Sequence, residues 1–266
     1  YIRMLILMLV SLYTSRVVLD TLGVEDYGIY NIVGGIVVLF TFINNAMVTS
    51  TQRYLNYEIG RKDFESTRNV FSISLNIHVL IAILIIILSE TIGLWLLNTT
   101  IQYPESRATA VQSIYQLSVF TTCIKIIRTP YNAAIIAFEK MSFYAYLSIF
   151  EATIQLVAIY ILKVIDFDRL IMYGVLLLII AIIINICYYL YCRVNFNVCK
   201  YILPKNKSLY KQLLSFSSWS LFGGVANIAA SQGLNMLLNT FFGVTVNAAM
   251  GIANQVNTAV TSFVTS

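Results

Sequence analysis

Long apolar runs, separated by short polar stretches, dominate this chain. Eight of the runs have the length of a membrane-spanning helix, roughly 17–25 residues each. They lie at 1–19, 29–50, 70–97, 108–127, 142–162, 170–191, 213–239 and 245–266. The pattern predicts an all-α integral membrane protein, a polytopic bundle of about eight transmembrane helices.

The composition agrees with a surface that faces lipid. Of the 266 residues, 59% are hydrophobic and 11% are charged, whereas a soluble domain carries roughly 25% charged residues. The net charge of +5 could suggest nucleic-acid binding. The basic residues are spread singly through the loops, however, so we expect no nucleic-acid partner. Their placement instead indicates which side of the membrane each loop faces.

The Lys and Arg residues divide unevenly between alternate loops. With the N-terminus inside, 13 lie on the inner side and 4 on the outer side. The outer four are Arg16, Arg107, Lys163 and Arg169. Because cytoplasmic loops are enriched in basic residues, this split predicts a cytoplasmic N-terminus and supports the number of predicted spans.

A short segment near the start recurs near the end. Leu22–Tyr30 (LGVEDYGIY) returns 220 residues later as Phe242–Met250 (FGVTVNAAM). Six apolar runs separate the copies, and parallel repeats of this kind are typical of transporters. The charge count places both copies on the outer side, so we interpret them as the outward gate region of each half.

The repeat predicts the domain organisation. We expect a six-helix N-terminal lobe over 1–191, a cytoplasmic linker over 192–212, and the first two helices of a second lobe over 213–266. About four further helices are expected beyond Ser266 by the same logic. The chain begins with Tyr1 rather than Met, so we also expect a missing N-terminal piece.

The sequence contains no recognised motif for catalysis or metal binding. The loops are too short for a separate catalytic domain, which needs at least about 50 residues. No phosphate-binding GxxxxGK[ST], HExxH, GxSxG or CxxC pattern occurs. We therefore expect a protein that is not an enzyme and has neither a metal nor a cofactor. A membrane-embedded polymerase or acyltransferase is the less favoured alternative.

Glu151 lies at the centre of the predicted span 142–162. A carboxylate at this depth costs about 2.5–3.5 kcal/mol on insertion scales, so it should face a wet cavity or a partner. It is our candidate for coupling transport to protons or cations. The alternative is a carboxylate that is protonated, or paired with a neighbouring helix for packing.

Two cations lie on the first predicted span. Arg3 shares a helix face with Ser11 and Thr14. A cationic strip of Arg3 and Arg16 could hold a phosphate group. Alternatively, each arginine snorkels to its own membrane interface.

Polar side chains form stripes on the spans that flank the repeated segment. The candidate cavity-lining residues are Asn31, Asn44 and Asn45, then Asn227, Ser231 and Asn235, and finally Asn254 and Asn257. Stripes at matching repeat positions predict the walls of one aqueous cleft. Hydrogen bonding between helices, without a ligand, is the alternative.

Three other ionisable residues receive structural interpretations. His78 has no partner in the sequence and is expected to be a packed, hydrogen-bonded residue. Lys125 and Arg128 precede Pro130, which is expected to end or kink the helix. We interpret these two cations as interfacial anchors.

The motifs together resemble a known family. Leu12–Leu19 (LYTSRVVL) followed by Leu22–Asn31 (LGVEDYGIYN) is similar to bacterial polysaccharide-biosynthesis flippases of the multidrug/oligosaccharidyl-lipid/polysaccharide (MOP) exporter superfamily. Thr51–Leu55 (TQRYL), Glu90–Trp95 (ETIGLW) and Pro130–Ala133 (PYNA) look like the branch for lipopolysaccharide, O-antigen or capsule export. The resemblance covers essentially the whole chain.

The resemblance implies two six-helix lobes of the MATE type around a central cavity. It implies a bacterial inner-membrane protein that moves a lipid-pyrophosphate-linked oligosaccharide to the periplasmic leaflet by alternating access. Basic residues would line the cavity, and Arg53 matches the motif at the inner end of the second span. Cytoplasmic glycosyltransferases and the periplasmic polymerase are implied partners, besides membrane lipids. A cation-coupled multidrug exporter on the same fold is the alternative function.

Overall fold

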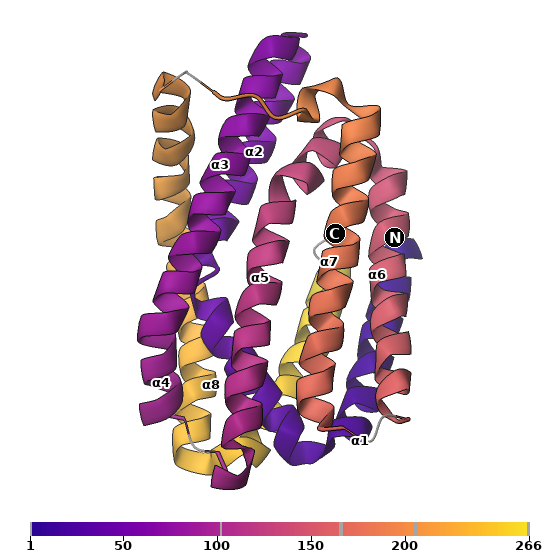
Figure 1. Cartoon of the computed structure of the whole chain (residues 1–266), viewed down its shortest axis with the longest axis vertical. Helices are drawn as coiled ribbons and strands as arrows, with labels where there is room; N and C mark the ends of the chain where they lie inside the picture. The colour runs from indigo at the N-terminus through magenta and orange to yellow at the C-terminus, as the bar shows by residue number, and fades with distance from the viewer. Residues whose placement is uncertain (1, 102, 165–166, 205–206, 265–266) are drawn as a thin grey trace.

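The computed structural model describes residues 2–101, 103–164, 167–204 and 207–264. The regular elements in this part of the chain are all helical and run roughly side by side (Figure 1). They are α1 (Ile2–Leu39), α2 (Phe42–Gly60), α3 (Phe64–Leu88), the π-helical turn η1 (Ser89–Gly93), α4 (Leu94–Thr99), the 3₁₀ turn η2 (Glu105–Arg107), α5 (Ala108–Ala137), α6 (Met141–Leu162), α7 (Arg169–Asn195), the 3₁₀ turn η3 (Asn197–Cys199) and α8 (Lys207–Val264).

Six stretches of the described chain are long and apolar enough to cross a membrane. They are Leu5–Val38, Phe64–Thr99, Glu105–Ala137, Met141–Leu162, Arg169–Asn195 and Gln232–Thr258. The first and last contain backbone breaks, so each of them joins parts of two predicted spans. The all-α membrane class predicted from the apolar runs agrees with this architecture.

The two breaks are the glycines of the repeated segment. Gly23 interrupts α1 with φ 82° and ψ 168°, and Gly243 interrupts α8 with φ 76° and ψ −174°. This region of backbone space is essentially restricted to glycine. Each helix is therefore split into two arms, 2–22 and 24–39 in α1, and 207–242 and 244–264 in α8. Both breaks lie at the same end of the bundle (Figure 1).

Aspartate side chains fix where two helices begin. Asp63 Oδ1 accepts a hydrogen bond of 2.9 Å from the Ser66 N–H at the start of α3. This hydrogen bond holds the pKa of Asp63 below its ordinary value. At the start of α7, Asp168 Oδ1 accepts from the N–H groups of Leu170 and Ile171. Both are N-caps of the kind that satisfies the free donors of a first turn.

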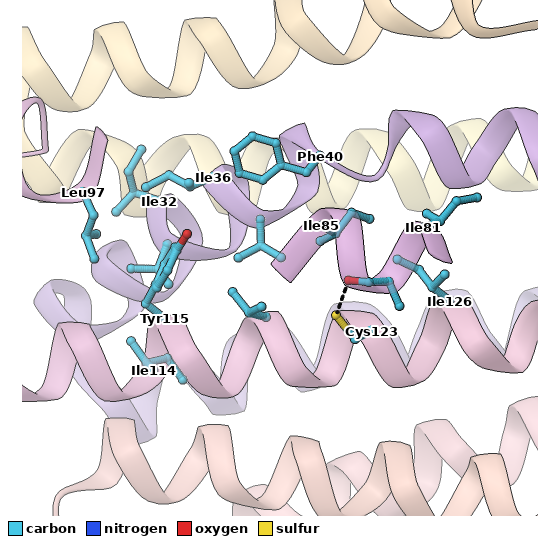
Figure 2. Close-up of a cluster of buried hydrophobic side chains, with 14 of the residues drawn as sticks. Ile32, Ile36, Phe40, Ile81, Ile85, Leu97, Ile114, Tyr115, Cys123 and Ile126 are labelled. Carbon is cyan, nitrogen blue, oxygen red and sulfur yellow. Dashed lines mark hydrogen bonds between the residues drawn. The ribbon is translucent and has the colours of Figure 1, made fainter. Parts of the chain in front are cut away.

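The largest apolar core joins α1, α3, α4 and α5. Figure 2 shows Ile32 and Ile36 of α1, and Phe40 just after its end, facing side chains of the other three helices. Tyr115 of α5 lies fully buried in this core, and its hydroxyl donates to the Ser89 carbonyl at 2.7 Å. Gly93 leaves room for that ring, because a Cβ there would lie 2.0 Å from the Tyr115 hydroxyl oxygen.

One predicted helix end is wrong. The fourth span was expected to end near residue 127, before Pro130, but α5 continues through Pro130 to Ala137. Proline removes only one backbone hydrogen bond from a helix. Tyr131, Ala134 and Ile135 beyond it are buried in a second core with α6 and α7, and this packing stabilises the continuation.

Candidate functional site

The second arm of α1 packs against both arms of α8 at three glycines, which form the α1–α8 interface. A Cβ on Gly28 would lie 2.3 Å from the carbonyl oxygen of Val244, and one on Gly35 would lie 2.8 Å from Oε1 of Gln232. A Cβ on Gly251 would lie 2.6 Å from the side chain of Asn31. Side chains larger than hydrogen would push the two helices apart, so glycine sets their distance here.

A cavity of about 750 Å³ opens beside this interface. Its polar wall comes from both arms of α1 and from the second arm of α8, with Ser11, Thr14, Asn31, Asn254, Gln255 and Thr258 among the lining residues. Gln255 bridges the helices, because its Oε1 lies 3.3 Å from the donating Tyr27 hydroxyl and its Nε2 donates to Ser11 Oγ at 3.4 Å. The volume is in the range of ligand-binding pockets.

A smaller cavity of about 260 Å³ adjoins the first. The two share Tyr30, Asn31, Gly251 and Asn254 as lining residues. Gln232 and Asn235 from the first arm of α8 line the smaller cavity as well, and they hydrogen-bond each other at 3.1 Å. Both arms of α8 therefore border the polar space.

Lys125 is the charged residue among the described lining residues of the larger cavity. The Lys125 side chain is accessible from this cavity. Along α5, Lys125 lies about 26 Å from the first residue of the helix, at a rise of 1.5 Å per residue. Lys125 was expected near a helix end as an interfacial anchor, but α5 continues for twelve residues beyond it, to Ala137, and Lys125 lines the cavity. The continuation of the helix leaves the lysine deep in the bundle.

Glu151 has an ion-pair partner. Its Oε2 lies 3.2 Å from Nη1 of Arg128, and each side chain is 19% exposed. The predicted need for a cavity or a partner is therefore met by a partner on the neighbouring helix. Arg128 also lies over the ring of Tyr188, 5.2 Å from its centroid. Arg128 is thus a partner within the bundle rather than the interfacial anchor that was expected.

The predicted site residues fall into three groups. Asn31, Asn235 and Asn254 line the cavities. The side chains of Arg16, Arg53 and Asn257 are exposed and lie outside both linings, whereas Asn44 is half-buried with an Oδ1 that accepts no hydrogen bond from the described residues. The side chains of Arg3, Asn45, Asn227 and Ser231 lie outside the described part of the structure.

His78 is fully buried in α3. Its Nδ1 lies 2.7 Å from the carbonyl oxygen of Ser74 and must donate to it, since a carbonyl only accepts. Ser74 in turn hydrogen-bonds Thr51 of α2 at 2.7 Å. These contacts fit the packed, hydrogen-bonded role expected for His78.

An arginine and two aspartates form an ion-pair cluster near the Gly23 turn. Arg107 at the start of α5 binds Asp26 of α1 through Nε at 2.9 Å and Nη2 at 2.5 Å. Its Nη1 contacts Asp168, the N-cap residue before α7, at 2.6 Å. Arg107 was expected on the outer side, but the sequence did not predict its partners, because the pairs join residues 61 and 81 positions apart.

The helix arrangement is similar to that of a known transporter. The inward-facing structure of a multidrug resistance MATE family transporter of the MOP superfamily matches with a TM-score of 0.77 and 12% sequence identity. The chain has the MATE fold. The match covers 92% of this chain and 57% of that one, so this chain spans little more than half of the neighbour's length. The sequence matches no family model and no curated protein.

The comparison confirms the predicted fold class. The helices, including the two that break at Gly23 and Gly243, follow the MATE/MOP arrangement that the sequence resemblance implied. The division into an N-terminal lobe, a linker and a partial second lobe stays a prediction.

Proposed function

We propose that this protein is a transporter that moves a lipid-pyrophosphate-linked oligosaccharide across the bacterial inner membrane by alternating access. The fold supports a membrane transporter. The observation that carries the choice of substrate is Lys125 in the polar cavity, since its charge would attract the pyrophosphate group. Asn, Gln, Ser and Thr side chains around it can donate hydrogen bonds to sugar hydroxyl groups.

The charge balance supports an anionic substrate. Glu151 and Arg128 neutralise each other as a pair, and Lys125 is the charged residue in the described lining. A cationic drug would need an acidic group in the cavity, whereas a pyrophosphate needs a basic one. The cavity therefore suits a pyrophosphate better than a cation.

Complementation tests this proposal. The complete protein, expressed in a strain that lacks its own exporter for a matching glycan, should restore surface polysaccharide. A Lys125→Gln variant produced at the same level should restore little, and an Arg16→Gln variant should restore it fully. Failure of the complete protein to restore any surface polysaccharide, in strains with several glycan types, would contradict the proposal.

A cation-coupled multidrug exporter is the second candidate. Glu151 near the middle of α6 favours it, as does the similarity of the fold to a multidrug resistance transporter. On this account Glu151→Gln should abolish gradient-driven drug export while the protein still folds. Drug susceptibility in an efflux-deficient host separates the two candidates.

A further inference from the structure

A separate pocket lies at the end of the bundle opposite the glycine turns. It has a volume of about 760 Å³ and lies between the start of α3, the end of α5 and the chain that follows α7. Phe138 and Phe196 form part of its wall, with ring centroids 4.4 Å apart and planes 12° from parallel. The cavity of about 750 Å³ beside the α1–α8 interface shares none of its described lining residues with this pocket.

The pocket lies at the level where lipid headgroups are expected. Helix α6 has 22 residues and is therefore about 33 Å long, close to the hydrocarbon thickness of about 30 Å. Its first residue, Met141, marks the edge of the hydrocarbon. Phe138 precedes Met141 by three residues, in the turn between α5 and α6, and Asn195 ends the neighbouring helix α7, so both of these lining residues are at that edge.

Two opposite charges face this pocket from one helix. Glu65 and Arg68 are three residues apart on α3 and both line the pocket. Among the described residues, neither forms an ion pair. Arg68 Nε donates to the Lys200 carbonyl at 2.7 Å, which fixes the guanidinium and leaves its other N–H groups for a ligand.

Exposed apolar side chains lie in the pocket lining and next to it in the sequence. Phe64, which lines the pocket, is 73% exposed, and Val194, next to the lining residue Asn195, is 82% exposed. In a membrane these side chains would contact acyl chains, so an apolar surface continues from the pocket towards the hydrocarbon. A ligand with one phosphate, one ammonium and two acyl chains matches these features together.

We propose that this pocket binds a zwitterionic aminophospholipid of the adjacent leaflet, of the phosphatidylethanolamine type. Arg68 binds the phosphate and Glu65 binds the primary ammonium group. A primary ammonium donates three hydrogen bonds, which the quaternary ammonium of phosphatidylcholine cannot do. An anionic lipid such as phosphatidylglycerol would place no positive charge against Glu65. The proposal does not depend on the transported substrate.

Lipid retention tests this inference. The complete protein is reconstituted in vesicles containing equal amounts of phosphatidylcholine, phosphatidylethanolamine and phosphatidylglycerol, then extracted in mild detergent, and the retained lipids are quantified by mass spectrometry. The wild type should enrich phosphatidylethanolamine about fivefold over phosphatidylglycerol, the size expected for one partly exposed ion pair.

Variants of the charged pair make the result specific. Glu65→Gln should abolish the enrichment, Arg68→Gln should lower retention of all three lipids, and Arg61→Gln, an exposed residue outside the lining, should change nothing. Unchanged apparent melting temperatures would show that the variants fold. Equal retention of phosphatidylglycerol by the wild type, or enrichment that survives Glu65→Gln, would overturn the proposal.

Discussion

Asn31 and Gly251 directly follow the two copies of the repeated segment, at equivalent positions 220 residues apart, and they contact each other at the α1–α8 interface. Contact between equivalent positions is expected where two repeats meet about a local two-fold axis. The shared backbone conformation of Gly23 and Gly243 agrees with such an arrangement. The repeat in the sequence is therefore also a repeat in the backbone.

The close approach of α1 and α8 predicts a penalty for a methyl group at Gly28. Its Cβ would lie 2.3 Å from a backbone oxygen, which cannot rotate away. We expect Gly28→Ala to destabilise the protein by about 1–3 kcal/mol, as overpacking does. The apparent melting temperature in detergent measures this. Gly34→Ala is the matched control, since nothing lies within 4 Å of its Cβ, and it should be neutral or stabilising.

Substitution of the glycines at the two turns should lower stability through backbone conformation alone. Gly23 and Gly243 have open space around them but positive φ. We expect Gly23→Ala and Gly243→Ala each to cost about 1–3 kcal/mol. Gly233→Ala, in open space within helical backbone, provides the comparison. If all three variants melted at the same temperature, the turns would not need glycine.

The Glu151–Arg128 pair predicts strong coupling between two mutations. Glu151→Gln or Arg128→Gln alone leaves an uncompensated charge in a partly buried site, so each should destabilise the protein. The double variant removes both charges and should be more stable than the sum of the single effects predicts, by about 1–3 kcal/mol. The apparent melting temperatures of the wild type, the two single variants and the double variant complete this double-mutant cycle. Additive effects would mean that the pair contributes no coupling.

The Arg107 cluster predicts that lysine cannot replace arginine. Arg107 contacts two carboxylates with three of its nitrogens, a geometry that a single ammonium group cannot reproduce. We expect Arg107→Lys to cost about 1–3 kcal/mol, because two half-buried carboxylates lose hydrogen bonds. Lys163→Arg at the exposed pair with Asp20 should change stability little. Equal effects of the two substitutions would contradict this reading.

The apolar helices were predictable from the sequence, because hydrophobic length determines them. The repeated segment was found as well, but not the backbone conformation of Gly23 and Gly243 that breaks α1 and α8. Pro130 was misread, since packing beyond it decides whether the helix continues. That error hid Lys125, whose depth depends on where α5 ends. The pairing of Arg107 with Asp26 and Asp168 depends on tertiary proximity, which residue spacing does not encode.

The candidate site was predictable only in part. Asn31, Asn235 and Asn254 lie on polar stripes that helical periodicity identifies. Arg16 is on the same helix as Ser11 and Thr14, but its side chain is exposed while theirs line the cavity. A helical face alone does not determine which residues reach a space formed by several helices.

The most direct test of the central claim is lipid transfer across a vesicle membrane. The complete protein is reconstituted in liposomes, and the rate at which a labelled polyprenyl-diphosphate oligosaccharide reaches the opposite leaflet is measured. We predict transfer by the wild type and by Lys125→Arg, and a rate lower by about tenfold for Lys125→Gln, since one charge-assisted contact to the pyrophosphate is lost. Transfer by Lys125→Gln at the wild-type rate, or no transfer by the wild type, would contradict the account.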